Sequence, residues 1–242
     1  MARVLIYTVS RADTTSRVVR ALDSLREGQA TTGYEHEWVL WCNSPQLLEA
    51  TKLGWLHGQV RSYNGGENVG QHVALGEVLK YARELHYDFI VKVDDDLEWM
   101  TKGWLRKLVA IEEECYKFSG RYPLLAPRVL GLKNPIPIAA KIKLGKIPLY
   151  VVPIVGGACR LHHISFFDDY VPDVRLALGA GGDTSIAAHA EKIQVANFVA
   201  KWVSVRHQTA KMEEADPDYF RMHSVYQTIP YIPHWKGTND AS

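Results

Sequence analysis

The chain has 242 residues, of which 47% are hydrophobic and 23% are charged, and this composition is that of an ordinary globular protein with room for a sizeable core. The formal net charge of +1 excludes recruitment of nucleic acid or membrane by bulk charge, so such binding would need a local patch. Cys42, Cys115 and Cys159 form no C-x-x-C pair, and we expect buried free thiols rather than a disulfide or zinc site. The apolar runs 4–9 and 147–159 are too short or too interrupted by proline for a transmembrane segment or signal sequence, which favours a cytoplasmic protein.

Short apolar runs alternate with helical patterns through the first half of the chain. We expect strands at 4–9, 38–42, 59–63 and 89–93, and helices at 15–26, 46–53, 70–85 and 102–118. This alternation predicts an α/β fold with a doubly wound sheet. Ligands bind such sheets where the strands end, so the residues that follow the strands are the first candidates for a site.

The second half is less regular. We expect strands at 124–129, 149–155 and 201–205 and a helix at 184–192. The segment 131–146 combines Pro and Gly with four lysines, which indicates a mobile basic loop or a short hairpin. His162 and His163 are adjacent, and we interpret them as residues of the surface or of the acceptor lobe, without a metal.

Three carboxylates, Asp94, Asp95 and Asp96, follow the predicted strand 89–93 directly. Adjacent acids repel one another and have poor strand propensity, whereas a divalent cation would offset the repulsion. The sequence therefore indicates a metal held against a phosphorylated substrate. The alternative is a turn that caps the following helix, since Asp is common in both roles.

Further polar residues follow the other strands and should converge with the aspartates at one edge of the sheet. The candidates for contacts to a nucleotide donor are Thr8, Ser10, Arg11, Asn43, Asn68 and Gly70, together with Asp94 and Asp95.

The order of these parts resembles the glycosyltransferases of the GT-A fold, especially the large family two. Asn68-Val69-Gly70 resembles the stretch before the D-x-D strand of that family, and residues 89–96 resemble that strand itself. Gly182-Asp183 is similar to the position of the acidic base, and His207 to the late metal-binding histidine. The resemblance covers residues 4–208 and implies a single GT-A domain, a Rossmann-like open mixed sheet flanked by helices.

The resemblance implies a metal-dependent hexosyltransferase that moves a sugar from a nucleotide-diphosphate sugar to an acceptor hydroxyl with inversion. The pyrophosphate leaving group develops negative charge, which Mn²⁺ or Mg²⁺ would stabilise, and an imidazole ligand would favour Mn²⁺. Asp96 and His207, with Asp94, are the expected metal ligands, and Asp95 is expected at the donor sugar.

Asp183 is the expected base, although the family often carries two adjacent acids at this position and Gly182 replaces one of them here. The alternative for Asp183 is an ordinary helix N-cap. Asp168, Asp169 and Asp173 are the other acids that could serve as the base.

On this reading, residues 1–210 form the catalytic domain, with a nucleotide-sugar-binding half at 1–100 and an acceptor half at 101–210. Residues 211–242 form a tail that packs on the site or closes over it. A polyanionic acceptor, DNA or another nucleic acid or a phosphorylated glycan or lipid, would suit the lysines, which could equally keep a solvated loop soluble. These lysines are Lys133, Lys141, Lys143 and Lys146.

Two other functions remain open from the sequence. A nucleotidyltransferase also uses aspartates and a metal on a related sheet, but it usually carries a glycine-rich loop after the first strand, which residues 8–17 lack. A catalytically silent protein that binds a nucleotide or a sugar is the alternative outside enzymes, and turnover would distinguish it.

Overall fold

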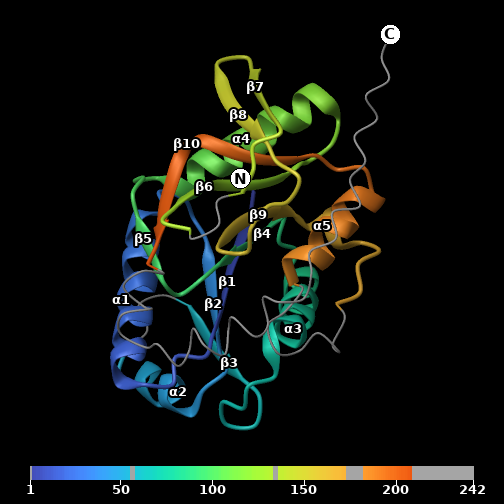
Figure 1. The fold of residues 1–242 in the computed structure, drawn as a ribbon. Helices are drawn as coiled ribbons and strands as arrows, with labels where there is room; N and C mark the ends of the chain where they lie inside the picture. Colours follow the sequence, from blue (N-terminus) through green and yellow to red (C-terminus); the bar gives the residue numbers. More distant parts are fainter. Residues whose placement is uncertain (1, 55–57, 133–135, 173–181, 209–242) are drawn as a thin grey trace.

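A computed structural model of the chain describes residues 2–54, 58–132, 136–172 and 182–208 (Figure 1). Its strands are β1 (Val4–Ser10), β2 (Glu37–Cys42), β3 (Gln59–Ser62), β4 (Phe89–Val93), β5 (Leu97–Trp99), β6 (Leu124–Leu130), β7 (Ala140–Leu144), β8 (Ile147–Val151), β9 (Cys159–His163) and β10 (Asn197–His207). Its helices are α1 (Thr15–Thr31), α2 (Pro45–Thr51), α3 (Gly70–Glu84), α4 (Trp104–Ser119) and α5 (Gly182–Lys192), with a short 3-10 helix η1 (Ile164–Phe167).

The described strands form one mixed sheet in the order β3-β2-β1-β4-β9-β6-β10-β8-β7, with β5 paired to β10. The strands β3, β2, β1 and β4 are parallel, as their βαβ connections require. Beyond β4 the direction changes, because β9 runs antiparallel to both β4 and β6. The open mixed sheet flanked by helices that we expected is therefore confirmed.

Helices cover both faces of the sheet (Figure 1). Residues of α1, α2 and α4 belong to one apolar cluster, where Leu25 and Trp104 are fully buried. Residues of α3, η1 and α5 belong to the other cluster, on the opposite face, where Leu79 and Phe167 are buried. The parallel strands have helices on both faces, and for this reason their sequences are almost continuously apolar. In β4 every residue is buried.

The predicted elements of the first half agree with the structure, with shifts at the ends. The first helix extends to Thr31, beyond the predicted end at 26. The fourth helix ends at Ser119, and Gly120 after it has a φ of 70°, a left-handed conformation that glycine adopts without steric cost. The segment 131–146 contributes β7 and the turn of a hairpin with β8, and a short hairpin was one of the two forms we expected.

Two strands were not predicted, β5 and β9, and the surface position expected for His162 is wrong. His162 lies in the middle of the sheet, fully buried, with Phe166 and Phe167 each 4.8 Å from its ring. Burial holds the pKa of His162 well below its usual range, so the ring is neutral. We did not predict β9 because a strand in the middle of a sheet was expected to be apolar, and β9 contains an arginine and two histidines.

Cys42, Cys115 and Cys159 are buried and free, as the sequence predicted. Among the described helices, none combines the length and the hydropathy needed to cross a membrane. The proposed C-terminal tail at 211–242 lies outside the described residues.

Candidate active site

The three aspartates lie where β4 ends, in a loop that is anchored to the strands beyond β4. The backbone N–H of Asp94 donates to the Ala158 carbonyl at 2.7 Å, and Gln208 N–H donates to the Asp96 carbonyl at 3.0 Å. The following strand, β5, pairs antiparallel with the end of β10, with Leu97 opposite His207. This pairing brings His207 to the aspartates although more than a hundred residues of chain separate them.

Asp94, Asp96 and His207 each offer one ligand atom, and these atoms lie within 4.8 Å of one another. His207 Nε2 is 3.3 Å from Asp96 Oδ2, while the other carboxylate oxygen, Asp96 Oδ1, is buried without a hydrogen-bond partner in the described residues. A buried carboxylate oxygen without a partner is costly, and a cation would satisfy it.

The electrostatics of this group also suit a cation. Burial, and then the charges of Asp94 and Asp95, raise the pKa of Asp96 well above its usual range. Burial lowers the pKa of His207, which leaves a neutral imidazole with a lone pair for a metal. Oxygen and imidazole ligands of this kind fit Mn²⁺ or Mg²⁺, with Mn²⁺ favoured by the nitrogen.

Asp95 is turned toward the end of β1 instead. The hydroxyl of Ser10 donates to the Asp95 carboxylate, and the Ser10 carbonyl accepts from the Asn43 N–H at 2.7 Å. Burial raises the pKa of Asp95, and the hydrogen bond from Ser10 opposes this shift. The structure thus brings together Ser10, Asn43 and Asp95, which we had assigned to the donor.

The other predicted donor residues are placed differently. Thr8 is fully buried and its hydroxyl accepts a hydrogen bond from the Trp38 indole at 3.1 Å, so this side chain belongs to the core and does not face the sheet edge. Arg11 is half-buried just after β1. Asn68 is exposed before α3, where its side-chain oxygen accepts from Gly70 N–H at 3.1 Å.

Asp183 lies in the first turn of α5, which begins at Gly182, and it is not the residue that precedes the helix. Its carboxylate accepts from the Gly157 N–H at 2.7 Å and from the Arg160 guanidinium at 2.7 Å. The Asp183 side chain therefore contacts β9, at Arg160, and the turn before β9, at Gly157, in place of the N-cap role that was the alternative. The side chain stays 42% exposed, which leaves it accessible to a substrate hydroxyl.

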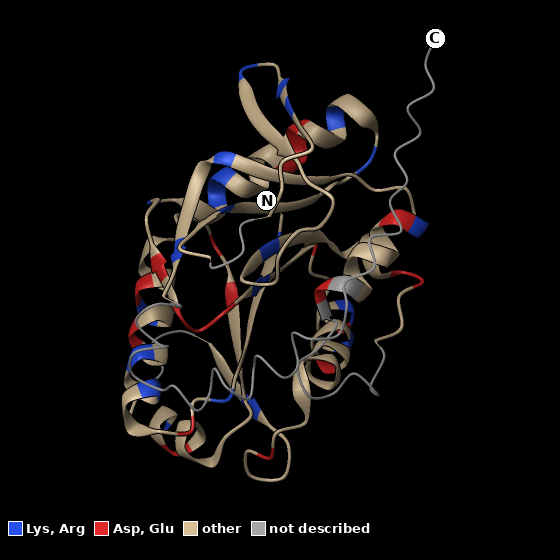
Figure 2. Cartoon of the chain, in the orientation of Figure 1, with Lys and Arg blue, Asp and Glu red and all other residues tan. Residues whose placement is uncertain are grey.

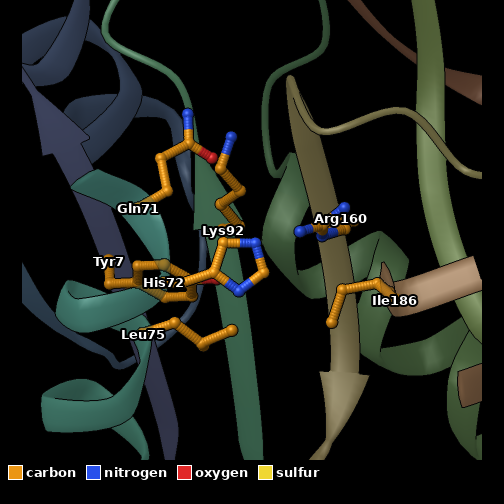
Figure 3. Close-up of a pocket in the computed structure, with 7 residues that line it drawn as sticks. All are labelled: Tyr7, Gln71, His72, Leu75, Lys92, Arg160 and Ile186. Atoms are coloured by element: carbon orange, nitrogen blue, oxygen red, sulfur yellow. The ribbon is translucent and has the colours of Figure 1, made fainter. Parts of the chain in front are cut away.

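Arg160 and Lys92 are site residues that the sequence did not assign. They face each other on β9 and β4, with Tyr7 next in register on β1, and all three line a small pocket with His72 of α3 (Figure 3). Lys92 is 3% exposed and its ammonium donates to the Asp94 carboxylate. A lysine inside an apolar strand is a feature of the sequence that could have identified Lys92. No such feature marked Arg160, because the position of β9 could not be predicted.

The basic segment lies apart from the aspartates. Lys141, Lys143 and Lys146 are exposed on the hairpin of β7 and β8, which projects from the sheet edge (Figure 2). In the strand order, β9, β6 and β10 separate β4 from β8. Four strand spacings of about 4.8 Å give about 19 Å between β4 and β8. Lys133 lies outside the described residues.

Neither a protein-family model nor a curated protein matches this sequence. Solved structures do match. A crystal structure of GalNAc-T7 with UDP, GalNAc and Mn²⁺ superposes with a TM-score of 0.61 at 15% identity, over 85% of this chain and 43% of that chain. Residues 1–349 of S. aureus TarS superpose with a TM-score of 0.59 at 14% identity, over 96% of this chain and 67% of that chain.

The same TarS fragment in complex with UDP-GlcNAc superposes with a TM-score of 0.55 at 14% identity, over 85% of this chain and 58% of that chain. This chain spans less than half of GalNAc-T7, at 43%, and 36% of a longer TarS structure. The chain therefore has the GT-A fold.

Proposed function

We propose that this protein is a metal-dependent glycosyltransferase that moves a hexosyl group from a nucleotide-diphosphate sugar to an acceptor hydroxyl. The observation that carries the proposal is the group of Asp94, Asp96 and His207 at the edge of a GT-A sheet, with ligand atoms within 4.8 Å of one another. The fold neighbours support the donor class, since their structures contain UDP with GalNAc and Mn²⁺, or UDP-GlcNAc.

Asp94, Asp96 and His207 would hold the divalent cation, Mn²⁺ or Mg²⁺. Bound there, it would supply Lewis-acid stabilisation to the charge that develops on a pyrophosphate leaving group. In the donor half, residues 1–100, Ser10 contacts Asp95 through its hydroxyl and Asn43 through its carbonyl. We assign these three residues to the donor together with Arg11, Asn68 and Gly70. The core position of Thr8 removes it from this set.

We assign the base to Asp183, in the acceptor half at residues 101–210. Each of its oxygens already accepts one hydrogen bond from the protein, which fixes the carboxylate, and each keeps a lone pair for the acceptor hydroxyl. A base and a leaving group on opposite faces of the sugar would give inversion. A nucleotidyltransferase or a silent binding protein would use the same metal group without transferring a sugar.

For the acceptor we propose a long polyanion, a nucleic acid or a phosphorylated glycan or lipid. The lysines Lys141, Lys143 and Lys146 gather on one hairpin of a nearly neutral chain. Lys141 and Lys143 stand on β7, five strand spacings or about 24 Å from the aspartate strand. A small anion could not reach both places, whereas a polymer could contact the hairpin and still present a hydroxyl at Asp183.

The metal assignment predicts that a uridine or guanosine diphosphate sugar raises the melting temperature in Mn²⁺ and fails to do so in EDTA. A ligand at a hundred times its dissociation constant adds about 2.7 kcal/mol, which shifts the melting temperature of a chain this size by roughly 5 to 10 °C. Asp96→Asn should abolish the shift, and Asp23→Asn, at an exposed acid on α1, should preserve it. An equal shift in EDTA would reject the metal.

The base assignment predicts that Asp183→Asn lowers kcat by about a hundredfold to ten thousandfold, because amides do not accept the proton. Donor binding in Mn²⁺ should persist, as measured by thermal shift. Asp23→Asn is the matched control, since Asp23 is an exposed acid on α1 outside the candidate site, and it should transfer sugar normally. Near wild-type turnover by Asp183→Asn would refute the assignment.

The acceptor proposal predicts salt-dependent binding of duplex DNA that weakens when Lys141, Lys143 and Lys146 become alanine. Each phosphate contact contributes about 0.9 to the slope of log affinity against log salt, so losing three should lower that slope by about 2.7. The control triple change at Lys52, Lys80 and Lys117, exposed lysines on other elements, removes equal charge. Single-stranded DNA and a neutral oligosaccharide complete the series, and equal effects of both triple changes would defeat the proposal.

A further inference from the structure

A continuous series of polar contacts joins the metal-side carboxylate Asp94 to Asp183. The Lys92 ammonium donates to the Asp94 carboxylate and also to the Gly157 carbonyl oxygen, at 2.5 Å. The N–H of the same Gly157 donates to Asp183 Oδ2 at 2.7 Å. Arg160 holds the other oxygen of Asp183, Oδ1, at 2.7 Å. One glycine therefore contacts both halves of the candidate site.

Burial restricts the positions that Lys92 can adopt. Lys92 and Arg160 are each 3% exposed and lie opposite each other on neighbouring strands. Burial disfavours the charged form of Lys92, but the carboxylates of Asp94 and Asp183 together outweigh it, so the pKa of Lys92 is raised. A buried ammonium needs its partners at close range, since an unpaired charge there is strongly destabilising. The two acceptors of Lys92, Asp94 just after β4 and the Gly157 carbonyl before β9, are thus held close to the same ammonium.

Gly157 leaves room for Asp183 only because it lacks a side chain. A Cβ at this position would overlap the carboxylate of Asp183, with Oδ2 at 2.9 Å. Any larger residue would displace the base candidate from the turn. The neighbouring Gly156 differs, because a Cβ there would meet the flexible end of Ile136, at 3.2 Å.

We propose that Lys92 is a positioning residue that couples cation binding at Asp94 to the placement of Asp183 through Gly157. This inference rests on the proposed function. An Asp94 carboxylate shared with a divalent cation attracts the ammonium less, so Lys92 bonds more strongly to the Gly157 carbonyl. The turn that carries the Gly157 N–H, and with it Asp183, then adjusts to the loaded site. In this role Lys92 acts through its contacts to Asp94 and Gly157.

Titration of the protein with Mg²⁺, followed by the backbone amide NMR signal of Gly157, tests this coupling without turnover. In the wild type we expect the signals of both His207 and Gly157 to shift with the same Mg²⁺ dependence. In Lys92→Met the His207 shift should persist, while the Gly157 shift should fall by at least a factor of three. Lys80→Met, at an exposed lysine of α3, should behave as the wild type.

A kinetic measurement gives a second readout. Lys92→Met and Gly157→Ala should each lower kcat by about a hundredfold, the cost expected from a misplaced catalytic group, with the donor KM within threefold of wild type. Gly156→Ala is the matched control and should stay within threefold in both constants. A raised donor KM with an unchanged kcat would overturn the positioning role.

The outcomes separate this inference from the proposed function. A Gly157 shift that survives in Lys92→Met would reveal a direct effect of the nearby ion and would overturn the coupling. A wild-type Gly157 signal that stays still while His207 responds would overturn it too, even if Lys92→Met does not fold. If His207 does not respond either, the metal site of the proposed function has failed, and the coupling fails with it.

Discussion

The carboxyl groups of Asp94, Asp95, Asp96 and Asp183 converge at the carboxyl end of β4, and the placement of the surrounding elements follows from how this charge is balanced. Lys92 pairs with Asp94 and Arg160 pairs with Asp183, both from within the sheet. Asp95 and Asp96 form no ion pair with Lys92 or Arg160, and burial raises the pKa of both carboxyl groups, so a cation bound beside them would favour their charged forms. An apolar sheet core would have left all four carboxylates uncompensated.

This balance explains why polar residues occupy the centre of the sheet. Tyr7, Lys92 and Arg160 stand in register on β1, β4 and β9, where apolar side chains would pack more cheaply. Burying these polar side chains carries a desolvation penalty. It also places the charges of Lys92 and Arg160 next to Asp94 and Asp183 in the candidate site. Sites at strand ends gain precision in this way, because their supporting side chains stand on rigid elements and not on the loops themselves.

Sequence reasoning reached the parts of the site that depend on local order. The apolar strand before Asp94 and the helix patterns around it located the sheet edge, and the structure does bring Asp94, Asp96 and His207 together there. Arg160 and the burial of His162 were out of reach, since both depend on β9 entering the sheet antiparallel beside β4, a pairing between residues far apart in the chain. Thr8 was assigned to the donor site for a related reason. The sequence of β1 does not reveal that the Thr8 hydroxyl accepts a hydrogen bond from the Trp38 indole in the core.

The central claim is that this site transfers a sugar in a metal-dependent reaction. The most direct test incubates the protein with a panel of uridine and guanosine diphosphate sugars and candidate acceptors, in Mn²⁺ or in EDTA, and identifies the released product. The account predicts a free nucleoside diphosphate from at least one donor in Mn²⁺ and none in EDTA. Release of pyrophosphate from a nucleoside triphosphate and a sugar phosphate, equal release in EDTA, or binding of a donor without any turnover would contradict it.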